Sequence, residues 1–286
     1  MVVALGGRGQ LVGRSEECDF PPEVRSLPVV MRAKTLDREA PAGEIDARVS
    51  ETRRRGESLY TLDLPLLRSL GPDIILTQDL CGVCSVTEAE VIDACRAVAL
   101  DPTVISLNPR RLTEVKDSIG RVAAAIGRPE DAEALQRRFE RPASRAGAKA
   151  RKRVAVVEWL EPAILAGLWV PDMIELSGGT SVGPSAGEPG QRLDWVDLRR
   201  MEPDLVIVSP CSFDVRRTAE ELRRSQRTRA DLPKAPDGCW LVDEAYFSRP
   251  GPRLADGVEL LQRLLRHDST SDLPMPAERW TGIADH

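Results

Sequence analysis

Short runs of β-branched residues alternate along this chain with longer stretches that have the apolar spacing of amphipathic helices. This alternation predicts an α/β fold in which successive strands lie parallel and helices connect them. The expected strands cover residues 28–31, 73–77, 103–106, 153–157, 204–208 and 239–242. The expected helices cover residues 44–55, 64–69, 87–99, 112–126, 130–140, 195–200, 215–224 and 253–266.

Two segments of the first half are echoed in the second half, in the same order. Residues 70–77 read LGPDIILT and residues 201–208 read MEPDLVIV, and a cysteine follows each segment closely. Likewise, Gly6-Gly7 with LVGRS at 11–15 is similar to Gly178-Gly179 with SVGPS at 181–185. The echoes predict two similar halves, although Pro-Asp before a strand is also common turn chemistry.

Residues 112–152 separate the halves and have a helical pattern rich in Ala, Arg and Glu, with no strand signal. We therefore predict two Rossmann-like lobes joined by a long helical connector. The N-terminal α/β lobe covers 1–111, the connector 112–152, the C-terminal α/β lobe 153–268 and an extended tail 269–286. In paired α/β lobes a ligand binds beyond the carboxyl ends of the strands, in the cleft between the lobes. Site residues are thus expected in the loops that follow the strands.

Composition disfavours several classes of function. The chain has 286 residues and a net charge of -5, with no sign of the basic face of a nucleic-acid binder. His267 and His286 are its only histidines, so a zinc site with several imidazoles and a Ser-His-Asp triad are nearly excluded. No run approaches the roughly 20 apolar residues that span a bilayer, so membrane insertion is not expected.

The first residues lack the basic start and long apolar run of a secretory signal. The expected location is therefore the cytoplasm, or outside it if the N-terminus has been trimmed. In the reducing cytosol the six cysteines are expected mostly as thiols.

Cysteines mark two candidate sites. Cys81 and Cys84 form a Cys-x-x-Cys motif at the start of an expected helix, where the helix dipole lowers a thiol pKa and suits redox exchange or soft-metal ligation. Cys211 follows the echoed strand of the second half and is a candidate nucleophile or metal ligand. The alternatives are a packing or ligand-lining loop for the first pair and a free buried cysteine for Cys211.

Aromatic residues follow the first and last strands of the second half. Trp159 and Trp169 lie close together in sequence and suit a flat aromatic ligand, although both could equally anchor the core. Tyr246 and Phe247 lie beside Arg249, and together they offer a stacking surface next to a fixed cation. Such a surface suits an anionic aromatic or macrocyclic ligand.

Six motifs, in this order, resemble the cobalamin-binding, iron-complex-type substrate-binding proteins of ABC importers. They are LVGRS at 11–15, EIDARV at 44–49, GESLY at 56–60, PDIILTQ at 72–78, PDLVIV at 203–208 and YFSRPGPR at 246–253. The resemblance covers about residues 5–267. It implies the class III fold, in which a long helix bridges two lobes and a small-molecule complex is clamped between them. Proteins of this family bind corrinoids, haem or ferric siderophores.

The chain departs from the family pattern in three places. It begins without a signal sequence, and the usual first strand before Gly6 is missing. The resemblance also implies a permease-docking carboxylate on each lobe, but Pro65 and Val196 occupy those positions, with Asp63 and Asp194 nearby. We therefore predict a cytoplasmic member of the fold that does not dock on a permease in the usual way.

Our leading hypothesis is a non-catalytic protein that binds a corrinoid, or a related metal complex such as an iron complex, between the lobes. Its expected ligand-binding residues supply aromatic faces, cations for carboxylate or phosphate groups, and thiols that approach the metal. They are Arg14, Cys81, Cys84, Glu158, Trp159, Trp169, Cys211, Phe213, Tyr246, Phe247 and Arg249, with Cys81, Cys84 and Cys211 as the metal ligands.

Two other hypotheses stay open. One is an enzyme on the same two lobes in which Cys211, or the Cys81 and Cys84 pair, reacts and Glu158 acts as acid or base. Glu158 is a candidate because a carboxylate at a strand end rarely serves packing. The other is a protein with a cysteine-bound metal or cluster.

Overall fold

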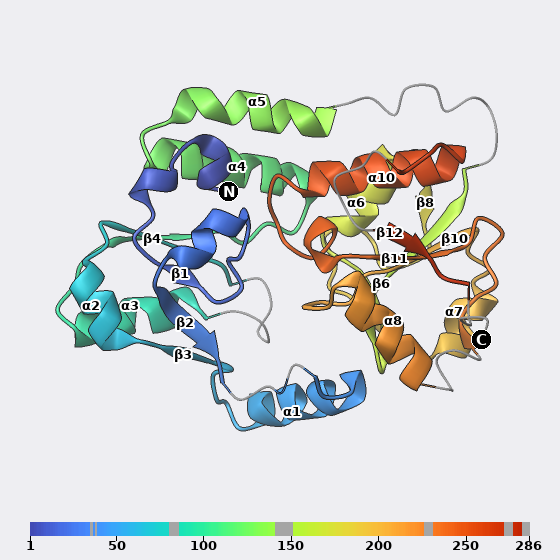
Figure 1. The fold of residues 1–286 in the computed structure, drawn as a ribbon, viewed down its shortest axis with the longest axis horizontal. Coiled ribbons are helices and arrows are strands. Elements are labelled where there is room, and N and C mark those ends of the chain that lie inside the picture. The colour runs from blue at the N-terminus through green and yellow to red at the C-terminus, as the bar shows by residue number, and fades with distance from the viewer. Residues whose placement is uncertain are drawn as a thin grey trace. The chain divides into compact units, whose positions relative to one another are not determined.

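The computed structural model describes residues 1–34, 37, 39–79, 86–140, 151–225, 231–271 and 277–281. Figure 1 shows the course of the chain. It divides into two compact units that are interleaved in sequence. Unit 1 comprises Met1–Ala40, Glu44–Asn108 and Ser118–Leu135, and unit 2 comprises Pro41–Gly43, Pro109–Asp117 and Gln136–His286. Within the described residues, no helix is long and apolar enough to cross a membrane.

Unit 1 contains two small sheets and the helices that pack on them. Strand β2 (Val29–Ala33) pairs in parallel with β1 (Arg14–Ser15) and in antiparallel with β3 (Tyr60–Leu62). Strands β4 (Ile74–Thr77) and β5 (Thr103–Ser106) form a parallel pair. Its helical elements are η1 (Val3–Leu5), η2 (Arg8–Gln10), η3 (Pro22–Ser26), most of α1 (Ala42–Arg54), α2 (Leu64–Leu70), α3 (Glu88–Ala97), most of α4 (Leu112–Ala125), η4 (Pro129–Asp131) and most of α5 (Ala132–Gln136).

Unit 2 is built on a seven-stranded mixed sheet in the order β12-β11-β10-β6-β7-β9, with β8 paired to β6. Its strands are β6 (Arg153–Leu160), β7 (Ala163–Leu165), β8 (Thr180–Ser181), β9 (Gln191–Leu193), β10 (Leu205–Val208), β11 (Cys239–Val242) and β12 (Ala277–Arg279). Strands β6, β8, β10 and β11 pair in parallel, and β7, β9 and β12 pair in antiparallel. All four residues of β10 are buried, as expected for a strand covered on both faces.

Helices cover both faces of this sheet. They are η5 (Arg137–Glu140), α6 (Val170–Leu176), α7 (Trp195–Arg200), α8 (Val215–Arg224), η6 (Glu244–Tyr246) and α10 (Leu254–Arg266). In Figure 1, α6 and α10 lie above the sheet and α8 lies below it. Helix α10 turns an apolar stripe toward α6, with Leu260 and Leu261 fully buried, and this stripe forms much of the core on that side.

The expected strands and all but one of the expected helices are present within a few residues, and the parallel pairs β4–β5 and β6–β10–β11 confirm the α/β fold. The strand expected at 153–157 continues to Leu160, so Glu158 and Trp159 lie within β6 and not in the loop after it. The stretch expected as one helix at 130–140 is instead a short α-helix, α5, between two 3-10 turns, η4 and η5. Helix α6 and the antiparallel strands were not expected. Helix α6 has consecutive buried residues in its first turn, so its sequence does not show the apolar spacing of an amphipathic helix. The antiparallel strands are only three residues long, which is too short for an alternating pattern to be recognised.

The echoed Pro-Asp segments adopt similar local structure in each unit, whereas the Gly-Gly echoes place their strands differently, at Arg14–Ser15 and Thr180–Ser181. Helix α2 directly, and helix α7 after Met201, are followed by a residue with positive φ, a proline, an aspartate and a parallel strand. The positive-φ residue is Gly71 (φ 50°) in unit 1 and Glu202 (φ 47°) in unit 2. A left-handed backbone favours glycine, so the second unit keeps this turn at a steric cost.

An ion pair within unit 2 fixes the start of α4 on α6. Arg111 donates to both carboxylate oxygens of Asp172, at 2.9 and 2.7 Å, and the Leu112 backbone N–H donates to the same carboxylate at 2.9 Å. Burial alone would raise the pKa of Asp172, but these hydrogen bonds and the Arg111 charge hold that pKa below its usual value. The helix start is therefore joined to unit 2 by charge-assisted bonds.

The Gly71 turn gives a direct test of this local structure. Neither Gly71 nor Gly9 has an atom within 4 Å of where a Cβ would stand, but only Gly71 has a left-handed backbone. We expect Gly71→Ala to lower the free energy of unfolding by about 1 kcal/mol, and Gly9→Ala to leave it nearly unchanged. Chemical denaturation measures both values, and equal effects would contradict the assigned turn.

Candidate ligand site

In unit 2, strand β10 ends at Val208 beside the middle of β6, which continues for three more residues to Leu160. The two strands pair in parallel with Val157 opposite Val208, so the residues that follow each strand partner lie side by side. The Cys211 backbone N–H donates to the Glu158 carbonyl at 3.0 Å. Ser212, the next residue, has a left-handed backbone (φ 65°), which turns the chain back toward α8. The strand pairing thus brings two of the predicted site residues together.

Two predicted aromatic residues pack on each other at this edge. The ring centroids of Trp159 and Phe213 are 5.5 Å apart, with the planes tilted by 53°. Phe213 is buried, whereas Trp159 is partly exposed and its indole N–H donates to the Glu161 carbonyl at 3.2 Å. Trp159 therefore keeps part of its surface open to a ligand while Phe213 supports it from within.

A third side chain at this edge was not predicted from the sequence. The Arg217 guanidinium lies over the Phe213 ring, 4.8 Å from its centroid, and forms a buried ion pair with Glu221 at 3.2 Å. Arg217 and Glu221 are spaced four residues apart on α8, the usual spacing of solvated helix pairs. Nothing in that spacing separates a buried pair from an exposed one, such as Arg216 with Glu220 on the same helix.

The other predicted aromatic residues lie in the core of unit 2. Trp169 is 4% exposed and Phe247 is 1% exposed, and the Trp169 indole donates to the Phe247 carbonyl at 2.7 Å. Tyr246 is also buried, with the Arg253 guanidinium 5.6 Å from its ring centroid. Burial raises the pKa of Tyr246 more than Arg253 lowers it. These surroundings fit the core-anchor interpretation of Trp169 and place Tyr246 and Phe247 in the core as well. A role of these three residues as ligand faces stays a prediction.

The two predicted arginines already have anionic or carbonyl partners. Arg249 is paired with Glu244 at 2.5 Å in unit 2. In unit 1, the Arg14 guanidinium donates to the backbone carbonyls of Ser15 and Glu16, both at 3.1 Å, and to that of Arg25 at 3.3 Å. Contacts of either arginine with a ligand stay predictions.

The thiols differ in accessibility. Cys81 and Cys84 lie outside the described residues, which include Cys18, Cys95, Cys211 and Cys239. Burial raises the pKa of Cys95, and raises that of Cys239 to about 12. Cys211 is partly exposed. Among the residues that the structure describes, no group of three or more His, Cys, Asp or Glu side chains is placed to hold a metal ion.

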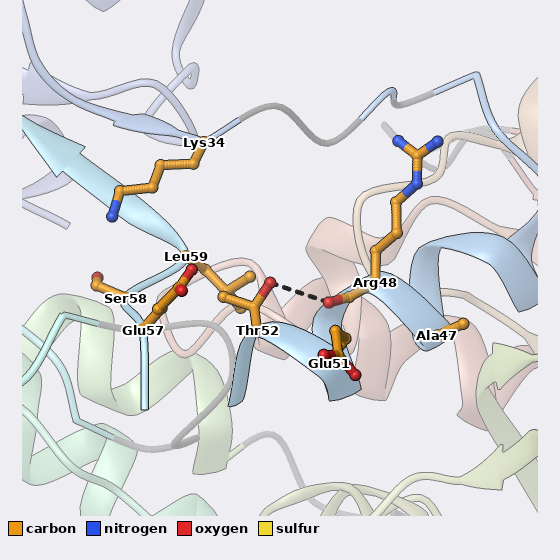
Figure 2. A pocket seen from close by; sticks show the side chains of 8 residues that line it. All are labelled: Lys34, Ala47, Arg48, Glu51, Thr52, Glu57, Ser58 and Leu59. Atoms are coloured by element: carbon orange, nitrogen blue, oxygen red, sulfur yellow. Dashed lines mark hydrogen bonds between the residues drawn. The ribbon is translucent and has the colours of Figure 1, made fainter. Parts of the chain in front are cut away.

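A separate groove of about 450 Å³ lies in unit 1, between α1 and the ends of β2 and β3 (Figure 2). Its charged walls are Lys34, Arg48, Glu51 and Glu57, so both signs of charge are present. Thr52 donates to the Arg48 carbonyl at 3.0 Å in its floor. The groove contains none of the predicted site residues.

No protein-family model matches the sequence, and no curated protein matches it. Solved structures do match. A periplasmic haem-binding protein from Pseudomonas aeruginosa has a TM-score of 0.68 at 18% identity, covering 94% of this chain and 89% of that one. A periplasmic vitamin B12-binding protein of Vibrio cholerae has a TM-score of 0.64 at 18% identity, with 93% and 92% covered. The chain has the class III periplasmic-binding-protein fold.

A third structure with this class III fold belongs to a ferric-hydroxamate transport system of Saccharomonospora viridis. Its TM-score is 0.63 at 14% identity, covering 92% of this chain and 88% of that one. The fold confirms the architecture that the six sequence motifs predict. At these identities the likeness concerns the fold, so the ligand has to be argued from the site itself.

Trp159, within β6, and Trp169, after β7, should respond differently to substitution. We expect Trp169→Phe to lower the free energy of unfolding by about 1–3 kcal/mol, because it leaves the buried Phe247 carbonyl without its donor. Trp159→Phe should cost less, because the Glu161 carbonyl that it leaves is exposed. Urea unfolding of both variants measures the difference, and a costlier Trp159→Phe would contradict the assigned core.

Thiol labelling should separate the cysteines of the native protein. We expect iodoacetamide at pH 8 to alkylate Cys18 and Cys211 and to spare Cys95 and Cys239, which are buried and have raised pKa values. Peptide mass spectrometry locates the label, and denatured protein labelled at all four positions is the control. Rapid native labelling of Cys239 would contradict its placement in β11.

Proposed function

We propose that this protein binds a metal complex of the haem, corrinoid or ferric-hydroxamate kind at the end of β10, beside the last residues of β6. The observation that carries the proposal is Trp159, which is partly exposed and supported by Phe213, and which follows Glu158, the backbone partner of the partly exposed Cys211. An aromatic face suits the flat surface of a macrocycle, and a thiol suits a soft or borderline metal. The class III fold supports the proposal because structures with this fold include haem-binding and vitamin B12-binding proteins.

Within this class we propose a corrinoid as the ligand, on the sequence motifs that resemble cobalamin-binding proteins. A corrinoid offers a broad apolar face to Trp159 and a cobalt ion to Cys211. Glu158, whose carbonyl holds the Cys211 backbone, then fixes where the thiol stands. Haem and a ferric hydroxamate are the other ligands that the same groups accommodate.

Absorption titrations with aquocobalamin, dicyanocobinamide, haemin and ferrichrome test this proposal. We expect a saturable spectral change with one of them, and Trp159→Leu should weaken that binding about 10-fold or more, since a stacked indole contributes about 1–3 kcal/mol. Trp280→Leu is the control, because Trp280 packs under Arg223, away from β6. A protein that gives no change with any of the four ligands would contradict the proposal.

A further inference from the structure

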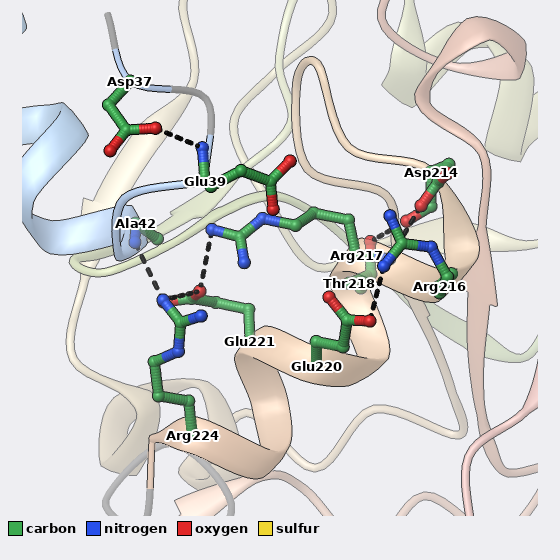
Figure 3. Close-up of polar contacts among 10 residues, drawn as sticks. All are labelled: Asp37, Glu39, Ala42, Asp214, Arg216, Arg217, Thr218, Glu220, Glu221 and Arg224. Carbon is green, nitrogen blue, oxygen red and sulfur yellow. Dashed lines mark hydrogen bonds and ion pairs between the residues drawn. The ribbon is translucent and has the colours of Figure 1, made fainter.

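The first turn of α1 is held by a carboxylate from α8 (Figure 3). The Ala42 N–H donates to Glu221 Oε1 at 2.9 Å, although the two residues are 179 positions apart. Ala42 is the first residue of α1 and is fully buried. Its N–H has no acceptor within its own helix, and a carboxylate is the favoured partner at the positive end of a helix dipole. The contact therefore fixes where α1 begins.

Glu221 is itself held from its own helix. Its other carboxylate oxygen pairs with Arg217 at 3.2 Å and with Arg224 at 3.7 Å, and the Arg217 and Glu221 side chains are 6% and 3% exposed. The start of α8 is fixed as well, because the Arg217 N–H donates to the Asp214 carboxylate at 2.7 Å. A buried carboxylate with these partners has little freedom to move alone.

A continuous series of contacts joins this carboxylate to the candidate ligand site. Trp159 packs on Phe213, and the Arg217 guanidinium lies over the Phe213 ring, 4.8 Å from its centroid. Arg217 in turn pairs with Glu221. Glu221 then binds Ala42. All of these residues belong to unit 2. From Glu44 onward, however, α1 belongs to unit 1, so the chain passes from one unit to the other within this helix.

We propose that α8 couples ligand binding at the candidate site to the strength of the hydrogen bond between Glu221 and the Ala42 N–H in the first turn of α1. A ligand that stacks on Trp159 shifts Phe213, the shift moves Arg217, and the Glu221 hydrogen bond to Ala42 changes in strength. Arg217 and Glu221 are positioning residues in this coupling and do not touch the ligand. The ligand step rests on the proposed function, whereas the contacts from Phe213 to Ala42 are tested without any ligand.

The rate of hydrogen exchange at the Ala42 amide reports directly on the strength of its hydrogen bond to Glu221. We expect Glu221→Gln to speed this exchange at least 10-fold, because it removes the charge that accepts from Ala42 and pairs with Arg217. Glu220→Gln is the matched control on the same helix, since Glu220 is paired with Arg216 at the surface. Equal exchange rates in the two variants would overturn the role of Glu221.

The contact between Phe213 and Arg217 is tested in the ligand-free protein with one variant and one control. Phe213→Leu removes the ring beneath Arg217, and we expect it to speed Ala42 exchange at least 3-fold. Trp280→Leu removes the ring beneath Arg223, also on α8, and should leave Ala42 exchange unchanged. An unchanged rate in folded Phe213→Leu would overturn the coupling.

Exchange at the Ala42 amide is then followed in the wild-type protein during ligand titration. This measurement tests the coupling even if Phe213→Leu does not fold. With whichever of aquocobalamin or haemin gives a spectral change, we expect Ala42 exchange to change at least 3-fold at saturation. The Leu260 and Leu261 amides of α10 serve as the internal reference. A saturated protein with an unchanged Ala42 rate would overturn the coupling. An absence of any spectral change would count against the proposed function, and the Glu221 and Phe213 variants would still decide the contacts.

Discussion

The parallel pairing of β6 with β10 is the constraint on which the candidate site depends. Both strands are buried on both faces for most of their length, so their register cannot slip without exposing valine and isoleucine side chains. That register places the end of β10 beside Val157 of β6, and the Cys211 N–H donates to the Glu158 carbonyl just beyond it. Cys211, Glu158 and Trp159 are therefore brought to one part of the sheet because the core beneath them is fixed.

The charged side chains Arg217 and Glu221 near this edge form an ion pair with each other. Arg217 and Glu221 form a buried pair, and removing one member of such a pair typically costs about 3–5 kcal/mol because the other charge remains buried. Glu221 additionally binds the first N–H of α1. The same pair thus stabilises α8, supports the Phe213 ring and anchors a second helix, which links the aromatic site to α1 through a few contacts.

Much of the fold follows from sequence periodicity. The six strands of β-branched residues, the helices between them and the echoed Pro-Asp turns all occur where the pattern predicts them. The site is harder to predict because burial depends on tertiary packing. Trp159 and Trp169 look alike in the sequence, yet one is partly exposed and the other donates to Phe247 within the core. Arg217 and Glu221 have the spacing of surface charges, and only the fold shows that they are buried.

The central claim is that a metal complex binds against Trp159 at the ends of β6 and β10. A crystal structure of the protein grown with aquocobalamin, and a parallel one grown with haemin, tests it most directly. The account predicts macrocycle density in contact with the Trp159 ring and the metal on the side of Cys211. Density at another place on the molecule, with the Trp159 surface left open, would contradict it.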